Sequence, residues 1–271
     1  MLCFSSSLFV NAQELKRCGT DEAQNRFFAQ HPQIYQDFLN REESFRQLDE
    51  KEAKTNYAAA RTSAAVLIVP VVFHIIHQYG PENLSDAKIK EAVDVMNQDF
   101  RKQNADTAQT IPLYQPIMAD CEIEFRLATI DPNGNCTNGI ERFYSPQTNN
   151  GSEDAKFNQW PQNKYLNIWV VKKMGPSHLN AAAYSYFPGG APGGGDGIIC
   201  LYDYVGTNPG NSHTLSHEAG HWLNLPHTWG STNQPNVACG NDNVSDTPIT
   251  KGSNLVCNLN LAACNPPIIE N

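Results

Sequence analysis

A pair of histidines four residues apart, with a glutamate directly after the first, constrains this chain more than any other feature. The segment 217–227 reads HEAGHWLNLPH and contains His217, Glu218, His221 and, six residues further on, His227. On an α-helix, residues i and i+4 lie on one face, so His217 and His221 can direct their ring nitrogens at one point. Three imidazoles can bind a catalytic zinc ion and leave a fourth position open for water. Glu218 would then lie beside that water and act as its general base.

The third histidine makes this pattern specific. For His227 to reach the same ion, the chain must leave the helix and turn back, which usually requires a residue with positive φ. Asn224 stands at this point, and asparagine tolerates the left-handed region better than other non-glycine residues. Pro226 then prevents the helix from resuming. The alternative is a helix that carries these residues on a solvated or internally satisfied face, but the combined spacing favours zinc.

Composition indicates a globular protein of an oxidising compartment. Of the 271 residues, 40% are hydrophobic and 17% are charged, so the chain can bury a full core. The net charge of −9 and the lack of a basic cluster argue against nucleic acid or an anionic membrane as a partner. No apolar stretch is long enough to span a bilayer. The eight cysteines suit a secreted protein.

The N-terminal part of the sequence differs in character from the rest. Residues 1–12 resemble the end of a secretory signal, with a short apolar run and a small-residue cleavage site; a disordered terminus is the alternative. Residues 13–64 are polar, with helix-like patches at 22–38 and 42–61. They predict a mostly helical pro-segment, although a surface helical hairpin of the mature domain would have the same composition.

Residues 65–271 predict an α+β domain. An apolar, β-branched run marks the start of this domain, and Ser85 is a plausible N-cap for the helix that follows. The order of strand, helix, strands and helix predicts one mixed sheet backed by helices. The expected strands are 66–76, 121–130, 165–171, 181–187 and 198–204, and the expected helices run from residue 85 to about 103 and from about 213 to 223.

These residues resemble the pappalysin family of metzincin zinc peptidases. The resemblance covers the chain after Gln13 and implies a twisted mixed sheet, a backing helix and an active-site helix. Compared with the family pattern, the C-terminal subdomain is expected to be incomplete. It rests on HEAGHWLNLPHTWG at 217–230, DNVSDTP at 242–248, CNPP at 264–267, VVFH at 71–74 and RCGT at 17–20.

The resemblance implies a secreted zinc endopeptidase that is made as a latent zymogen. His217, His221 and His227 would bind zinc, and Glu218 would polarise the attacking water. Cys18 corresponds to a cysteine switch, in which a pro-segment thiolate occupies the open zinc position. A disulfide within the pro-segment or a free thiol is the alternative. The bond between Ala60 and Arg61 is then a candidate activation site.

Three further expectations follow from the resemblance. Peptide substrates would bind along the sheet edge at 181–187; the alternative is an ordinary short strand with exposed tyrosines. Asp242 and Asp246 could bind calcium, or form a metal-free turn rich in Asn and Asp. Cys239 would pair with Cys264, which leaves Cys257 for a partner further on.

One departure from the family pattern raises a rival function. Metzincins carry a methionine-containing turn after the third histidine, whereas all four methionines of this chain precede it. We therefore expect a chain truncated before that turn. This favours the alternative of a non-catalytic, zinc-stabilised peptide-binding module or an inactive fragment. A thermolysin-like peptidase with a distant glutamate ligand is disfavoured because His227 already supplies the third ligand.

The remaining histidines and the nearby tryptophans predict structural roles. His74 and His77 are three apart on an expected strand, so they point to opposite faces and suit packing or exposure. His213 would cap the zinc helix or support a ligand. Trp222 and Trp229 suit packing rather than substrate recognition.

Overall fold

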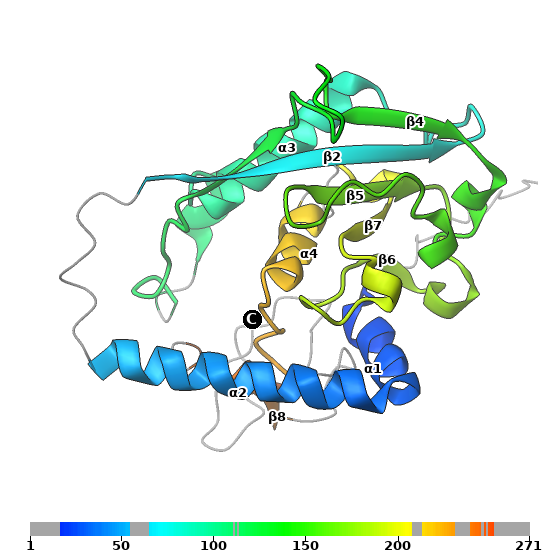
Figure 1. Ribbon diagram of the computed structural model, residues 1–271. Helices are drawn as coiled ribbons and strands as arrows, with labels where there is room; N and C mark the ends of the chain where they lie inside the picture. Colours follow the sequence, from blue (N-terminus) through cyan, green and yellow to red (C-terminus); the bar gives the residue numbers. More distant parts are fainter. Residues whose placement is uncertain are drawn as a thin grey trace, which may run out of the picture.

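The computed structural model describes residues 17–54, 65–110, 112, 114–207, 213–230, 239–244, 247 and 249–251. Its centre is a seven-stranded mixed sheet in the order β1-β6-β7-β5-β2-β3, with β4 also beside β2 (Figure 1). The expected mixed sheet backed by helices is confirmed. The strands are β1 (Arg17–Cys18), β2 (Leu67–His77), β3 (Ile123–Leu127), β4 (Ile140–Tyr144), β5 (Leu166–Val171), β6 (Ala181–Tyr184) and β7 (Ile198–Leu201).

Strand β2 organises the sheet because it is long enough to pair with three others. Its first half pairs in parallel with β3 and its second half with β4, while β5 lies in parallel along its other edge. Strand β7 continues the sheet in parallel beyond β5, and β6 is antiparallel to β7. The two-residue strand β1 runs parallel to β6 and forms the last strand at that edge. A second, two-stranded sheet pairs β8 (Cys239–Gly240) with β9 (Thr250–Lys251).

Two helices pack against the sheet and against each other. Helix α3 (Asp86–Phe100) contacts β3, and helix α4 (Thr214–Trp222) contacts β6 and β7. The Ser85 side chain accepts a hydrogen bond from the Lys88 amide, so the expected N-cap is confirmed. The helix expected from about residue 213 to 223 is confirmed as α4. Short 3-10 helices cover Ala105–Gln109, Pro146–Asn149, Glu153–Ala155, Pro176–His178, Pro192–Gly194 and Tyr202–Tyr204.

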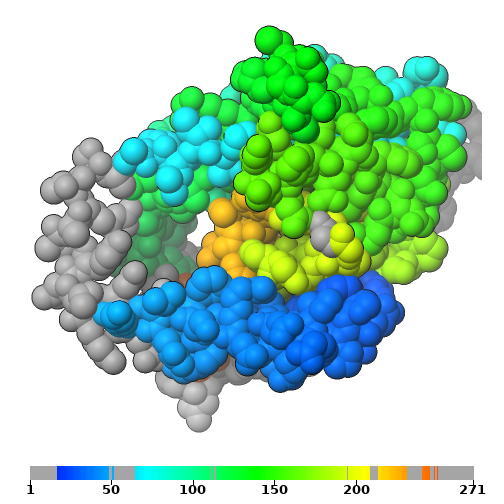
Figure 2. All heavy atoms as spheres, in the orientation of Figure 1, coloured from blue at the N-terminus to red at the C-terminus, as the bar shows by residue number. Residues whose placement is uncertain are grey.

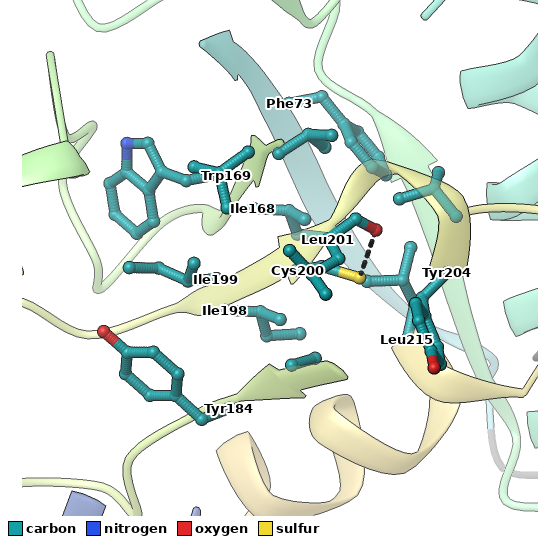
Figure 3. Close-up of a cluster of buried hydrophobic side chains, with 14 of the residues drawn as sticks. Phe73, Ile168, Trp169, Tyr184, Ile198, Ile199, Cys200, Leu201, Tyr204 and Leu215 are labelled. Atoms are coloured by element: carbon teal, nitrogen blue, oxygen red, sulfur yellow. Dashed lines mark hydrogen bonds between the residues drawn. The ribbon is translucent and has the colours of Figure 1, made fainter. Parts of the chain in front are cut away.

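The hydrophobic core lies between the sheet and these helices. Figure 3 shows that β2, β5 and β7 send Phe73, Ile168 and Ile198 into it, with Leu215 of α4 packed alongside. Full burial of such a side chain contributes roughly 1.5–3 kcal/mol to folding. The apolar face of α3 fills the same core through Ile89, Ala92, Val93, Met96 and Phe100. This packing holds α4 in place against the sheet.

The N-terminal segment, residues 17–54, forms β1 and two helices that lie across α4 and β6. These helices are α1 (Thr20–Gln30) and α2 (Pro32–Lys54) (Figures 1 and 2). Helix α4 lies between α2 and the strands β5 and β2 in Figure 1, whereas α1 contacts β6 directly. The expected helical patches at 22–38 and 42–61 placed the break between the two helices at the wrong position. The break falls at His31, whose φ of −131° is not helical, because the proline ring that follows disfavours the α conformation there.

Two expected strands were also too long, and other strands were not expected. Strand β6 ends at Tyr184 rather than at residue 187, and β7 ends at Leu201, where a 3-10 helix replaces the expected end of the strand. Strands β1 and β4 were not expected at all. Among the described residues, none of the helices combines the length and the apolar character needed to cross a lipid bilayer.

Candidate metal centre

Helix α4 and the turn after it bring the three motif histidines together. Their Nε2 atoms lie 3.1 Å apart in every pair. A tetrahedral zinc site with bonds of about 2.0–2.1 Å places two nitrogen ligands roughly 3.3 Å apart. His221 and His227 are buried, whereas His217 is exposed. The three nitrogens of His217, His221 and His227 therefore fit a single divalent ion.

The turn that returns His227 to the helix has the expected conformation. Asn224 has a φ of +76°, and the amide of Leu225 donates to the Gly220 carbonyl at 2.9 Å. The Asn224 amide in turn donates to the His221 carbonyl, and together these bonds form a Schellman motif. The expectation of a left-handed residue at Asn224 is confirmed.

Each of the two buried histidine rings of the cluster has a hydrogen-bond partner at Nδ1. The Leu225 carbonyl accepts from His221 Nδ1 at 2.7 Å, and Asp21 Oδ2 lies 2.9 Å from His227 Nδ1. A proton on Nδ1 leaves the lone pair of Nε2 free for the centre of the cluster. Burial also lowers the pKa of His221 to about 2. Its ring is therefore neutral, which is the metal-binding form.

Glu218 lies beside the cluster and is 1% exposed. Burial raises the pKa of its carboxyl to about 7. Its Oε2 accepts a hydrogen bond at 3.0 Å from Thr20 Oγ1, which itself accepts from the Ser185 amide at 3.0 Å. The N-terminal segment thus contacts both Glu218 and His227.

Cys18 reaches the cluster from β1. Its Sγ lies 3.4 Å from His221 Nε2, and the four candidate donor atoms of Cys18 and the three histidines lie within 4.8 Å of one another. Burial raises the pKa of the Cys18 thiol, whereas a bound divalent cation would favour the thiolate. Gly19 allows the close approach, because a Cβ there would lie 2.7 Å from that of Ala181.

The N-terminal segment also occupies polar backbone groups along the β6 edge. The Gly19 amide donates to the Ala183 carbonyl at 2.8 Å. The Gln24 side chain accepts from the Phe187 amide and donates to the Gly190 carbonyl, both at 3.1 Å. Within residues 181–187, Tyr184 and Tyr186 are buried, so the tyrosines that the alternative expected to be exposed are not exposed.

Sequence reasoning did not identify Thr20, Asp21 or Gln24 as residues of this site. Thr20 belonged to the RCGT stretch that carried the family resemblance, and Asp21 follows it directly. Their contacts depend on how α1 docks on residues more than 150 positions away. No local pattern in the sequence predicts contacts between segments that are so far apart in the chain.

The other expected structural residues lie outside the cluster. His213 occupies the N-cap position of α4 without a capping side-chain bond, and its Nδ1 contacts Asp99 of α3 at 2.9 Å instead. The Trp222 indole donates to Asp196, and Trp229 stacks on the His227 ring with centroids 4.5 Å apart. His74 and His77 are both buried.

Several expected residues fall where the structure gives no description. Asp242 is described, and its Oδ1 accepts from the Val244 amide at 3.0 Å, but Asp246 lies outside the described residues. The same holds for residues 1–12, the bond between Ala60 and Arg61, Cys257, Cys264 and the side chain of Cys239.

The fold and the site define the class of protein as a metalloprotease of the metzincin type. Residues 149–271 match the model of the M43 peptidase family, which is described as Pregnancy-associated plasma protein-A. Mature mirolysin of Tannerella forsythia, solved in complex with a cleaved peptide, is 35% identical with a TM-score of 0.63, and the match covers 70% of this chain and 74% of that one.

Two more comparisons extend the match towards the N-terminus. A mutant form of Tannerella forsythia promirolysin is 31% identical with a TM-score of 0.69, over 88% of this chain and 78% of that one. An extracellular metalloprotease of Neurospora crassa is 28% identical over 94% of this chain and 77% of its own length. The chain belongs to the M43, or pappalysin, family of peptidases. It is a metalloendopeptidase and is extracellular, as its curated relatives are.

Proposed function

We propose that the protein is a secreted, zinc-dependent endopeptidase made as a latent zymogen. The observation that carries this proposal is the convergence of three imidazole nitrogens 3.1 Å apart next to the buried Glu218 carboxylate. His217, His221 and His227 would hold the ion. When bound there, zinc supplies a Lewis acid for the scissile carbonyl and acidifies the attacking water.

In this proposal Glu218 is the catalytic residue of the chain. It takes the proton of the attacking water and passes it to the leaving amine. The carboxyl is buried and accepts a hydrogen bond from Thr20, so the N-terminal segment has to leave before Glu218 can meet the attacking water. Helix α4 positions it because Glu218 directly follows the first ligand histidine.

We propose that peptide substrates bind along the edge of β6, over residues 181–187. The Ala183 carbonyl and the amides of Ser185 and Phe187 already bond to the N-terminal segment. An extended peptide can bond to the same alternate residues by β-augmentation. Mature mirolysin was solved with a cleaved peptide, which supports the assignment of peptides as substrates.

The proposed latent state is supported by the N-terminal segment, which contacts the histidine cluster, Glu218 and the β6 edge. In the proposal, residues 13–64 are the pro-segment, Cys18 is the fourth zinc ligand, and the contacts with Glu218 and the β6 edge exclude substrate. Cutting the chain between this segment and residues 65–271 would free the site. The signal at residues 1–12, calcium at Asp242 and Asp246, and the Cys239–Cys264 pair remain predictions.

Replacement of the general base tests the proposal. In the chain activated by removal of the pro-segment, Glu218→Gln should lower casein cleavage by about 10²–10⁴-fold, the contribution typical of a general base. Its zinc content should match that of the parent. Asp94→Asn, the same change at an exposed position of α3, is the matched control and should cleave normally.

Two outcomes would contradict the assignment. Casein cleavage by Glu218→Gln at the parental rate would remove Glu218 from the mechanism. Zinc binding by an activated parent that cleaves no peptide would instead favour the non-catalytic binding module.

A further inference from the structure

We propose that Asp21 is a positioning residue that orients His227 for metal binding in the latent chain. The inference rests on the zinc site proposed above. The N-terminal segment would then supply two parts of the metal centre: the Cys18 thiolate as a ligand, and the Asp21 carboxylate as the partner of a different ligand. As a result, the latent chain retains zinc more tightly than Cys18 alone would achieve.

The contact between Asp21 and His227 is direct and buried. Asp21 Oδ2 lies 2.9 Å from His227 Nδ1, and the two side chains are 9% and 1% exposed. A carboxylate can only accept, so the ring nitrogen donates this hydrogen bond. The other ring nitrogen, Nε2, then directs its lone pair at the centre of the cluster, towards which Nε2 of His217 and of His221 also point. Carboxylate partners of this kind orient metal-binding histidines and raise their basicity.

The second buried histidine has a partner of different origin. His221 donates to the Leu225 carbonyl, which belongs to the turn after α4. This bond is independent of the N-terminal segment. Among the residues that the structure describes, Asp21 is the only hydrogen-bond partner of His227 Nδ1. Trp229 stacks on the ring and restricts its plane, but an indole face cannot select the nitrogen that carries the proton.

Asp21 is held rigidly enough to act in this way. It lies in the first turn of α1, between Thr20, which bonds to Glu218, and Gln24, which bonds to the backbone at Phe187 and Gly190. Phe27 of the same helix packs against Tyr186 with ring centroids 6.1 Å apart. These contacts fix the helix over the metal centre.

The alternative is that Asp21 is an ordinary acidic residue at a helix start, where it stabilises α1 through the helix dipole. Glu22, its neighbour in the same turn, provides the matched control because it carries the same charge but is exposed. A dipole effect would make the two residues similar. A positioning role would set Asp21 apart.

Chelator competition on the intact, full-length chain measures the effect. Asp21→Ala should weaken zinc binding by about 10–100-fold, the loss typical when such a partner is removed. Asp21→Asn should lose less, since the amide oxygen still accepts from Nδ1. Glu22→Ala should bind zinc like the parent. Equal affinity of the parent and Asp21→Ala would overturn the inference.

Cobalt substitution separates positioning from docking of the N-terminal segment. A thiolate ligand gives cobalt a charge-transfer absorption band, and Cys18→Ser should lose this band. Asp21→Ala should keep it while binding the metal more weakly. Loss of the band in Asp21→Ala would mean that the segment has undocked, which would overturn the positioning role.

The same titration distinguishes failure of the inference from failure of the proposed function. If the parent binds zinc no more tightly than a His217→Ala variant, the metal site itself is wrong and the inference falls with it. If the parent binds tightly and only the Asp21 variants fail to differ, the metal site stands and the inference alone is wrong.

Discussion

Asn224 determines the geometry of the candidate metal centre. Its positive φ ends α4 and lets the next three residues carry His227 back to the cluster. Because asparagine is one of the few residues that accept this conformation, the sequence alone was enough to predict the turn and the three converging histidines. The partners of His227 and Glu218 were not predictable, since Asp21 and Thr20 reach them only after α1 has docked.

Substitution of Asn224 tests this reading of the turn. Asn224→Ala should lower the free energy of unfolding by about 1–2 kcal/mol, because its Cβ is unfavourable in the left-handed region. Asn224→Gly should stay close to the parent, since it loses only a side-chain contact with Glu42. Urea denaturation of the full chain measures both. Equal stability of the alanine and glycine variants would show that the positive φ is not required.

At the scale of elements, predictability followed the strength of the local pattern. β2 has a long apolar run, α3 has apolar periodicity and a capping serine, and α4 carries the histidine motif, and the sequence predicted all three. β4 has charged residues at its centre, Glu141 and Arg142, and it forms because β2 offers a free length of edge. β1 has only two residues and exists through its pairing with β6. Such strands depend on tertiary context and leave little trace in the sequence.

The attachment of α3 to the sheet gives a prediction at this scale. The Asn97 side chain donates to the Phe125 carbonyl at 2.9 Å and accepts from the Phe125 amide at 2.7 Å, so it pairs with β3 like a short strand. Asn97→Ala leaves both backbone groups unpaired and should cost roughly 1–3 kcal/mol. Thermal unfolding measures this loss.

Asn97→Asp is the informative comparison because it keeps the acceptor and loses the donor. Its stability should fall between those of the parent and the alanine variant. If Asn97→Ala unfolds at the parental temperature, the pairing between α3 and β3 contributes nothing to stability.

At the scale of the whole molecule, the candidate metal centre joins residues that are far apart in the sequence. The N-terminal segment, the sheet and α4 all contribute to the surroundings of one cluster, so an ion there would stabilise the entire arrangement. The family resemblance predicted that Cys18 would approach the histidines. It could not predict how much of the N-terminal segment takes part, because α1 docks through Thr20 and Gln24 and α2 contacts Asn224 through Glu42.

Metal removal should therefore destabilise the intact chain as a unit. A ligand present at 1,000 times its dissociation constant adds about 4 kcal/mol to the stability of the folded state. We expect a chelator to lower the unfolding temperature of the parent by several degrees. The change should be much smaller in His227→Ala, which lacks one candidate ligand. An unfolding temperature that does not respond to the chelator would contradict a metal held by the folded cluster.

The candidate donor atoms come from distant parts of the sequence, since Cys18 and His221 are 203 positions apart. Every strand of the seven-stranded sheet also precedes α4 in the sequence. The ribosome therefore synthesises the N-terminal segment first and the three histidines much later. When His227 finally emerges, Cys18 and Asp21 are already present on the same nascent chain. If that segment has the role proposed for it, the active site is blocked as soon as it can form. No separate inhibitor protein then has to bind the enzyme.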